Sequence, residues 1–299
     1  MTKRPFKQID VFTAKPYLGN PVAVVLDGRG LTTAAMQRFT DWTNLSEATF
    51  LLPPEHPQAD YKVRIFCPGR ELPFAGHPTL GSCHAWLQAG GQPKGEYIVQ
   101  ECGVGLVKLR RDAVPDGERL AFAAPPLITS GPLPEEDVQL IARGLGVDRT
   151  DILHHAWCHN GPMWRGVMLK SAQQVLALKP DGKVLAGLDV GVVGAKAVTP
   201  GSPGGKVGAV GAYTDGSDCA FEVRAFFHIN KGVDEDPVTG SLNAAMAQWL
   251  IGAGLAPARY IASQGTALGR AGRVYVEQQG ADIWIGGHSV TCIEGSVTL

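Results

Sequence analysis

Short apolar segments alternate with polar turns along the first 110 residues of the chain. Short apolar or alternating segments predict strands over residues 8–12, 22–26, 49–52, 61–66, 97–100 and 105–110. A helix is predicted from Thr32 or Thr33 to about Trp42, because a threonine can cap its first turn. A second helix, from Pro78 to about Ala89, is apolar on most of its faces, which is typical of an interior helix.

The second half of the chain shows the same alternation of short strands with one apolar helix. We expect a helix over 135–144 and a central helix from Ser241 to about Leu250. Strands are predicted near residues 164–169, 195–198, 206–214, 220–227, 260–262, 273–277, 282–285 and 290–293. This pattern favours an α+β fold over a doubly wound parallel sheet. Each half is expected to be a curled, mostly antiparallel, barrel-like sheet around its central helix.

The two halves also share residues in the same order. One set recurs at a spacing of 160 residues: Val63, Arg64, Phe66 and Thr79 match Val223, Arg224, Phe226 and Thr239. A second set recurs at a spacing of 159: Pro78, Gly81, Ser82 and Ala85 match Pro237, Gly240, Ser241 and Ala244. Such a repeat predicts two related, pseudo-symmetric halves that face each other.

Proline-rich segments at 125–126 and 132–134 mark the best candidate for a linker between the halves. We therefore expect an N-terminal half over residues 1–125 and a C-terminal half over 126–286. The last strand, within 287–299, is expected to return to the N-terminal half.

Composition narrows the class of protein. The chain has 299 residues, which suits two domains, and its 44% hydrophobic and 18% charged residues exclude a disordered protein. A formal net charge of −1 without a basic run predicts no nucleic-acid partner. The chain has no signal-like start, no apolar span of membrane length and no CxxC among its six scattered cysteines. We expect a cytoplasmic protein with no membrane partner.

Two segments place a reactive type of side chain just before an apolar helix. His77 lies in the segment 76–82, and Asp236 begins the segment 236–241. The first turn of a helix has backbone N–H groups without an intrahelical acceptor, and these groups can bind an anion. We interpret the two segments as halves of one site for a small carboxylate-bearing molecule, with Gly240, Ser241 and nearby amides holding the carboxylate. The alternatives are a helix cap for Asp236 and a helix-start hydrogen bond for His77.

Other motifs carry less weight. The segment 201–207 resembles a phosphate loop but is one residue short between its glycines and ends in valine instead of serine or threonine. His154, His155, Cys158 and His159 are residue types that bind zinc, but they lack a second ligand pair at the usual spacing. We therefore predict no metal and no cofactor.

The chain resembles the phenazine-biosynthesis PhzF-like family, whose fold is that of diaminopimelate epimerase. The motifs that carry the resemblance run from residue 9 to 295: GNPVAVV (19–25), NLSEATF (44–50), PFAGHPTLG (73–81), EDPVTGS (235–241) and IGGHSVTCIEG (285–295). The resemblance implies a cofactor-independent isomerase that acts on a small carboxylate-bearing substrate, and a homodimer. It also implies that Glu47 and the two helix starts surround one cleft between the halves.

The resemblance further implies roles for particular residues. Glu47 corresponds to the general base and acid of the family, assisted by His77 and Asp236, and an apolar cleft would suit such a carboxyl group. Asn20, Ser46, Gly76, Thr79, Gly240 and Ser241 are the expected substrate contacts. Racemases and epimerases of this fold place cysteines at the positions of Gly76 and Asp236, so a two-thiol inversion is lost. An amino-acid epimerase or racemase, and a non-catalytic binding or scaffold protein, are the alternative functions.

Overall fold

The computed structural model describes residues 2–115, 117–199, 213–215, 217–229 and 232–299. The chain divides into two compact units, and each is described by itself. Unit 1 comprises Met1–Ala123 and Trp284–Leu299, and unit 2 comprises Ala124–Ile283. None of the helices in the described ranges is both long and apolar enough to cross a membrane.

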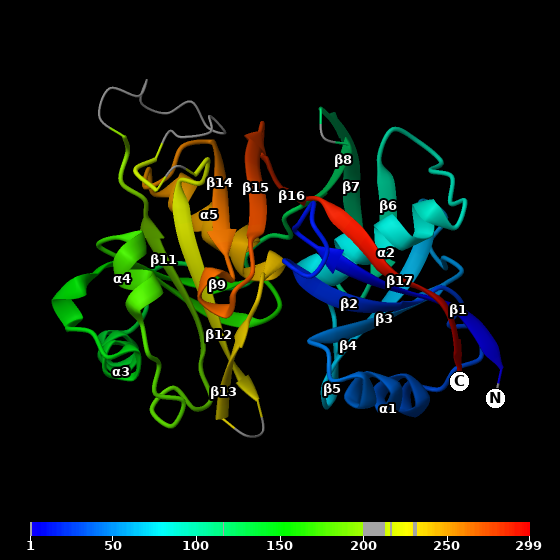
Figure 1. Ribbon diagram of the computed structural model, residues 1–299, viewed down its shortest axis with the longest axis horizontal. Helices are drawn as coiled ribbons and strands as arrows, with labels where there is room; N and C mark the ends of the chain where they lie inside the picture. The colour runs from blue at the N-terminus through cyan, green and yellow to red at the C-terminus, as the bar shows by residue number, and fades with distance from the viewer. Residues whose placement is uncertain (1, 116, 200–212, 216, 230–231) are drawn as a thin grey trace. The chain divides into compact units, whose positions relative to one another are not determined.

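Unit 1 contains a mixed sheet built mainly from antiparallel pairs. Its strands are β1 (Lys3–Val11), β2 (Asn20–Val25), β3 (Glu47–Leu52), β4 (Tyr61–Cys67), β5 (Arg70–Leu72), β6 (Ile98–Cys102), β7 (Gly105–Val114), β8 (Gly117–Ala123), β16 (Asp282–Gly287) and β17 (Ser289–Thr298). Neighbouring strands follow the order β17-β1-β2-β3-β4-β6-β7-β8-β16, and only β2–β3 and β4–β6 are parallel. In Figure 1 the last strand, β17 (red), lies along the first, β1 (blue).

Two helices cover opposite faces of this sheet (Figure 1). The helix α1 (Thr33–Thr43) is capped by Thr32, whose side chain accepts a hydrogen bond from Ala35 N, as the sequence predicts. It packs Phe39 against Phe50, which in turn contacts Phe66 edge to face.

The helix α2 (Gly76–Gln88) lies on the other face and contacts β1, β2, β3, β8 and β17. Its residues from Gly76 to Cys83 are all buried, which confirms the predicted interior helix. The Ser82 hydroxyl donates to the Thr49 hydroxyl of β3 at 2.9 Å. Glycine at position 81 permits close packing, since a Cβ there would lie 2.4 Å from Val22 Cγ1. The helix begins two residues earlier than predicted, because Pro78 is tolerated within the first turn.

Unit 2 also combines a mixed sheet with helices. Its strands are β9 (Ile152–His159), β10 (Met163–Leu169), β11 (Asp189–Ala195), β12 (Phe221–Ile229), β13 (Gly232–Asp236), β14 (Arg259–Gln264) and β15 (Gly272–Gln279). Its helices are α3 (Glu135–Leu145), α4 (Ala172–Ala177) and α5 (Gly240–Gly252), with short 3₁₀ turns at Arg149–Asp151 and Thr266–Leu268. The pairing order is β9-β10-β11-β12-β14-β15, with β13 on the far end of β12.

The strand pairings of unit 2 repeat those of unit 1. The pairs β2–β3 and β10–β11 are parallel, as are β4–β6 and β12–β14, while β3–β4 and β11–β12 are antiparallel. The side chains repeat too. Arg64 binds Glu71 and its guanidinium carbon lies 5.0 Å from the Phe66 ring centroid. Arg224 binds Glu235 and lies 4.9 Å from the Phe226 ring.

The strand-rich mixed α/β fold confirms the broad prediction, but several elements differ from it. The strand predicted at 195–198 is instead β11, and β5, β8, β9, β13 and α4 were not predicted. In β11 the glycine at position 191 interrupts the apolar pattern, and it is there because α5 packs closely: a Cβ would lie 2.4 Å from Leu242 Cδ1. The predicted strand at 206–214 falls largely outside the described residues, and the segment 201–207 falls entirely outside them.

We predict that Gly81→Ala destabilises the protein by about 1–3 kcal/mol, because the added methyl group overpacks α2 against Val22. Gly252→Ala, also in a helix, meets no atom within 4 Å and should be neutral or stabilise by up to about 1 kcal/mol. Urea unfolding of both variants tests this. Equal stabilisation of the two variants would show that the contact with Val22 does not limit the packing of α2.

Candidate active site

Unit 1 gathers one group of predicted site residues where β2, β3 and α2 begin. Glu47 is the first residue of β3, and its side chain is 14% exposed. Its Oε2 lies 3.3 Å from Nε2 of His77, the second residue of α2. On the other side of the ring, Asn20 Nδ2 lies 3.3 Å from His77 Nδ1. The structure therefore brings together three of the predicted site residues, Asn20, His77 and Glu47, within one unit.

His77 is uncharged in this environment. Burial lowers its pKa to about 3, while a hydrogen bond with the Pro21 backbone acts in the opposite direction. A neutral imidazole carries one N–H, and proline offers only a backbone carbonyl, so that N–H donates to Pro21. The Glu47–His77 contact is thus between a carboxyl group and a neutral imidazole, and it is not an ion pair.

The first turn of α2 offers two backbone donors. The first intrahelical hydrogen bond runs from Thr79 N to Ala75 O at 3.2 Å. Pro78 has no N–H, so the amides of Gly76 and His77 are those without an acceptor inside the helix. Gly76 is buried beside His77, and Ser46 is half-buried directly before Glu47.

Thr79, a predicted substrate contact, is held inside unit 1. It is fully buried, its amide donates to Ala75, and its hydroxyl accepts from Gln100 Nε2 at 3.0 Å. Unit 2 repeats this arrangement, since Gln264 Nε2 donates to the Thr239 hydroxyl at 2.9 Å. Neither glutamine was among the predicted site residues. Both glutamines are fully buried. The sequence signal that could have identified them is a polar residue within a largely apolar strand.

In unit 2, predicted site residues lie where β13 ends and α5 begins. Asp236 is the last residue of β13, and its Oδ2 accepts from the Thr239 hydroxyl at 2.6 Å. Asp236 does not cap the helix, because the N-cap is Thr239 and its side chain makes no capping hydrogen bond. The first intrahelical bond runs from Asn243 N to Thr239 O at 3.1 Å. The amides of residues 240–242 therefore have no acceptor within α5.

Ser241 is positioned by two residues that sequence analysis did not identify. Trp164 Nε1 donates to the Ser241 hydroxyl at 3.3 Å, and Asn160 Nδ2 donates to the Ser241 carbonyl at 2.9 Å. The hydroxyl keeps its own hydrogen for a further acceptor. Gly240 and Ser241 are both buried at the first turn, so an anion bound there would meet amides in a largely desolvated setting.

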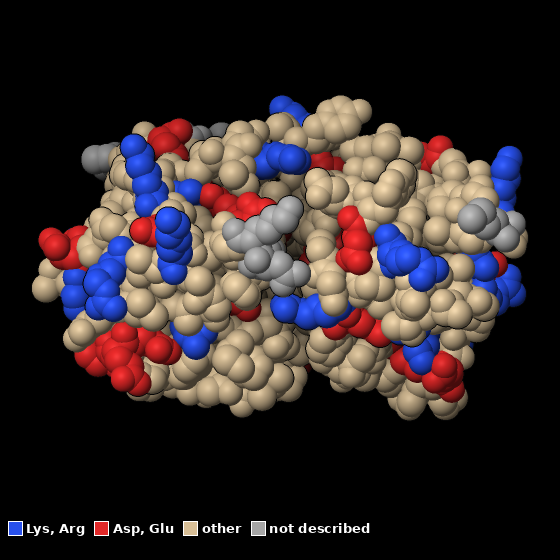
Figure 2. All heavy atoms as spheres, turned by 90° about the horizontal axis from the view of Figure 1, so that it is seen from below, with Lys and Arg blue, Asp and Glu red and all other residues tan. Residues whose placement is uncertain are grey.

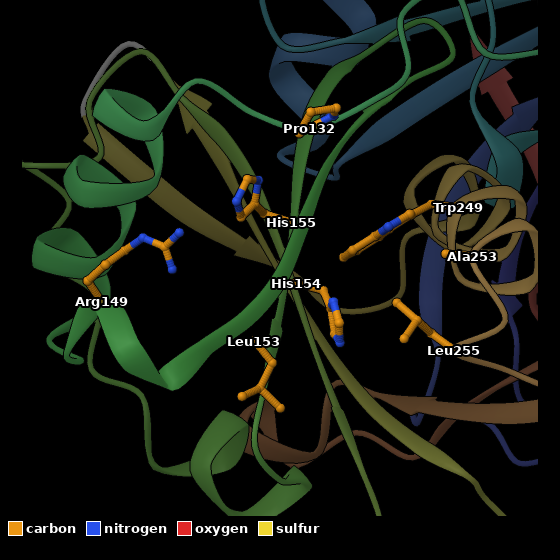
Figure 3. Close-up of a pocket in the computed structure, with 8 residues that line it drawn as sticks. All are labelled: Pro132, Arg149, Leu153, His154, His155, Trp249, Ala253 and Leu255. Carbon is orange, nitrogen blue, oxygen red and sulfur yellow. The ribbon is translucent and has the colours of Figure 1, made fainter.

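The histidine-rich strand β9 borders a separate cavity of about 300 Å³ in unit 2. His154 and His155 point to opposite sides of β9 (Figure 3), as neighbouring residues of a strand do. His155 Nδ1 accepts from Leu133 N at 3.1 Å, His159 Nδ1 lies 3.0 Å from the Thr129 hydroxyl, and burial raises the pKa of Cys158 to about 12. Within the described ranges no three potential ligands cluster as a metal would require. The absence of a metal stays a prediction.

Charged side chains of both signs are interspersed over the face shown in Figure 2, in keeping with the net charge of −1. This face shows no continuous basic field of the kind that binds nucleic acid.

Comparison with known proteins identifies relatives along the whole chain. The sequence model of phenazine biosynthesis-like proteins (PhzC-PhzF) matches residues 9–295. Antisense-enhancing sequence 1 of Schizosaccharomyces pombe is 35% identical, and the match covers 99% of each protein. An uncharacterized isomerase of Mesorhizobium japonicum is 33% identical over 100% of both. The trans-2,3-dihydro-3-hydroxyanthranilate isomerase of Pseudomonas fluorescens is 36% identical over 60% of this chain and 62% of that protein.

Solved structures share the fold at low sequence identity. A PhzF-family phenazine biosynthesis protein of Bacillus anthracis superimposes with a TM-score of 0.77 at 22% identity, and the match covers 100% of both chains. A hydroxyproline epimerase of Agrobacterium vitis gives a TM-score of 0.60 at 14% identity, covering 99% of this chain and 92% of that one. The resemblance inferred from the motifs is confirmed.

The buried neutral state of His77 predicts a pH-dependent stability. Between its folded pKa of about 3 and the ordinary value of 6.5, the unfolded chain binds more protons than the native protein. Stability should therefore fall as the pH drops below about 6.5, with a limiting slope of about 1.4 kcal/mol per pH unit from this group. In urea unfolding at pH 6.5, 5.5 and 4.5, His77→Gln should lose this part of the slope.

The matched control is His154→Gln, which removes an exposed histidine and should retain the parental slope. If the parent protein and His77→Gln show the same slope, His77 is protonated in the native state and the neutral assignment is wrong.

Proposed function

We propose a function on the premise that this chain belongs to the phenazine biosynthesis-like (PhzC-PhzF) family and is an isomerase. In the proposed function, the protein moves a proton on a small carboxylate-bearing molecule without a cofactor. The observation that carries the proposal is the Glu47 carboxyl group, 3.3 Å from neutral His77 at the buried start of α2. A positioned carboxyl group in an enclosed setting is suited to take up and return a proton.

In the proposed reaction Glu47 acts as base and then as acid. Its carboxylate removes a proton from a carbon next to a conjugated system, and the electron pair left on carbon shifts along that system. The same carboxyl group then returns the proton to a carbon further along, so the double bond migrates and the atoms balance. The neutral His77 ring lies 3.3 Å from the Glu47 carboxyl group and restricts its position, and Asn20 lies against the imidazole from the other side.

The substrate carboxylate is proposed to bind between the first turns of α2 and α5. Each helix start contributes about half a positive charge, so the two together offset one carboxylate. The amides of Gly76, His77, Gly240 and Ser241 are the donors, with the Ser241 hydroxyl beside them. This arrangement requires two pseudo-symmetric, barrel-like halves, over 1–125 with 287–299 and over 126–286, that face each other across one cleft. We also propose a homodimer and a cytoplasmic location.

Isomerisation is favoured over epimerisation by the residues at the two helix starts. Inversion at carbon needs a group that exchanges a proton on each side of the substrate. Gly76 has no side chain, and the Asp236 carboxyl group is occupied by the Thr239 hydroxyl at 2.6 Å. Glu47 is then the proton carrier on a single face. We propose that Asp236 has a supporting role, in which it fixes the position of Thr239 and of the first turn of α5.

The substrate class follows from the same features. One carboxylate at the helix starts, a conjugated carbon acid near Glu47 and the buried start of α2 suit a small cyclic or amino-acid-like acid. The compound named in the relative of Pseudomonas fluorescens, trans-2,3-dihydro-3-hydroxyanthranilate, belongs to this class and is the first candidate to assay.

We predict that Glu47→Gln lowers turnover by roughly 10²–10⁴-fold while preserving the fold, because glutamine cannot accept the proton. The assay is deuterium uptake from D₂O into dihydroaromatic and amino acids, followed by mass spectrometry and NMR. Glu96→Gln is the matched control, since Glu96 is exposed, and it should retain parental turnover. Near-parental turnover in Glu47→Gln would remove Glu47 from the mechanism.

The position of the label separates the alternatives. Labelling with a migrated double bond supports the isomerase. Labelling with inversion at a single carbon indicates an epimerase or racemase, and binding without labelling indicates a non-catalytic ligand-binding protein.

A further inference from the structure

Three side chains form one row across the sheet of unit 1. In the antiparallel pair β3–β4, Ala48 faces Phe66, so the preceding residue Glu47 faces Cys67. In the pair β4–β5, Cys67 faces Arg70. Residues that face each other across neighbouring strands point to the same side of a sheet. Glu47, Cys67 and Arg70 therefore project from the same face.

This face is the one covered by α2. Thr49 lies two residues after Glu47, on the same side of β3, and its hydroxyl bonds to Ser82 of α2. The opposite face carries Phe50 and Phe66, which pack against α1. Arg70 thus belongs to the side of the sheet that holds the candidate active site, two strands from Glu47.

The backbone at Arg70 is held in place by its surroundings. Pro68 and Gly69 form the two-residue turn between β4 and β5, and Gly69 adopts a φ of +84°, which favours glycine. Gly69 N donates to Asp41 Oδ1 of α1 at 2.9 Å. Gln37 Nε2 donates to the Cys67 carbonyl at 2.8 Å. The turn is therefore fixed to α1 from both sides, and the start of the Arg70 side chain is preorganised.

The charge of Arg70 is available to a ligand. In the described part of the chain, Arg70 makes no ion pair, and its sequence neighbour Glu71 is bound by Arg64 on the opposite face at 2.6 and 2.7 Å. Asp41 Oδ1 already accepts from Gly69 N and from Gln37. The Cys67 thiol lies in the field of both end groups of the row: burial is the main cause that raises its pKa to about 11, Arg70 acts to lower it and Glu47 to raise it.

We propose that Arg70 binds a second anionic group where the substrate carries one, so that among small acids the site favours those with two acidic groups. The inference rests on the proposed function, since it takes Glu47 as the group that meets the reacting carbon. Two strand spacings separate the backbones of Glu47 and Arg70 by about 10 Å. Both side chains extend from the same face, which leaves a span that suits one small ring. One acidic group of the ligand binds at the first turn of α2, the reacting carbon lies at Glu47, and the second acidic group meets the guanidinium fork of Arg70.

The test compares the binding of two acids that differ by one carboxylate. Benzoate and isophthalate are titrated into the full-length protein by calorimetry at low ionic strength. The parent protein should bind isophthalate about tenfold more tightly than benzoate, on the scale of one charge-assisted pair. Arg70→Gln should abolish this preference while leaving benzoate affinity within about twofold. Arg70→Lys should retain part of it, because lysine supplies the charge without the planar fork.

Arg143→Gln is the matched control, because it removes an exposed arginine from unit 2 and should bind both acids as the parent does. The parental preference should also shrink as salt is added, since Arg70 is exposed. The proposal is overturned if the parent protein does not bind isophthalate, or binds it no more tightly than benzoate. It is also overturned if Arg70→Gln weakens the binding of both acids equally. Binding is read without turnover, so this result is independent of the Glu47→Gln assay that tests the proposed function.

Discussion

The burial of the first turn of α2 is the constraint on which the candidate site depends. Only a helix start that is removed from water presents amides that bind an anion strongly, and only a buried imidazole stays neutral well below its ordinary pKa. The sequence makes this burial possible by placing small residues along α2, above all Gly81, where any side chain would collide with Val22. The same close packing brings His77 within 3.3 Å of Glu47, so the geometry of the proposed proton carrier follows from the packing of the helix.

Successive side chains along the strands of unit 1 point to opposite faces of its sheet, so the apolar packing residues and the candidate site residues lie on different faces. One face holds Phe50 and Phe66 against α1 and forms an apolar cluster. The other face, one residue out of step, carries Glu47 and Thr49 towards α2. A shift of one residue in the β3–β4 register would exchange these faces and bury the carboxyl group among the phenylalanines, which makes the register strongly determined. The apolar cluster beneath α1 thereby fixes where the carboxyl group points.

Much of this could be predicted from the sequence, for identifiable reasons. The Thr32 cap, the interior helix α2 and the start of α5 depend on local patterns, and the structure confirms them within two residues. The motif order also identified the family. The strand β11 was misplaced because its glycine at position 191 serves the packing of α5 and not the local pattern. The Glu47–His77 contact joins residues 30 positions apart, and the buried Gln100 pairs with Thr79 across two elements, so neither could be derived from spacing alone.

Comparison of the two units shows how one scaffold serves different purposes. Phe66 of β4 faces Ala48, and the corresponding Phe226 of β12 faces Val190, so the position of Glu47 is taken by Asp189 in unit 2. There the carboxyl group accepts a hydrogen bond from His228 N at 3.0 Å and closes the end of the strand pair. Two structural contacts occur in both units. One is an arginine–glutamate pair next to a phenylalanine ring, and the other is a hydrogen bond from a glutamine to a threonine hydroxyl. Both units thus have an acidic residue at this position. Asp189 of unit 2 is a structural hydrogen-bond acceptor, whereas Glu47 of unit 1 lies beside the neutral imidazole of His77. In the proposed reaction, a fold with two similar units therefore uses one of these two acids as its single proton carrier, and a one-sided isomerisation requires that asymmetry.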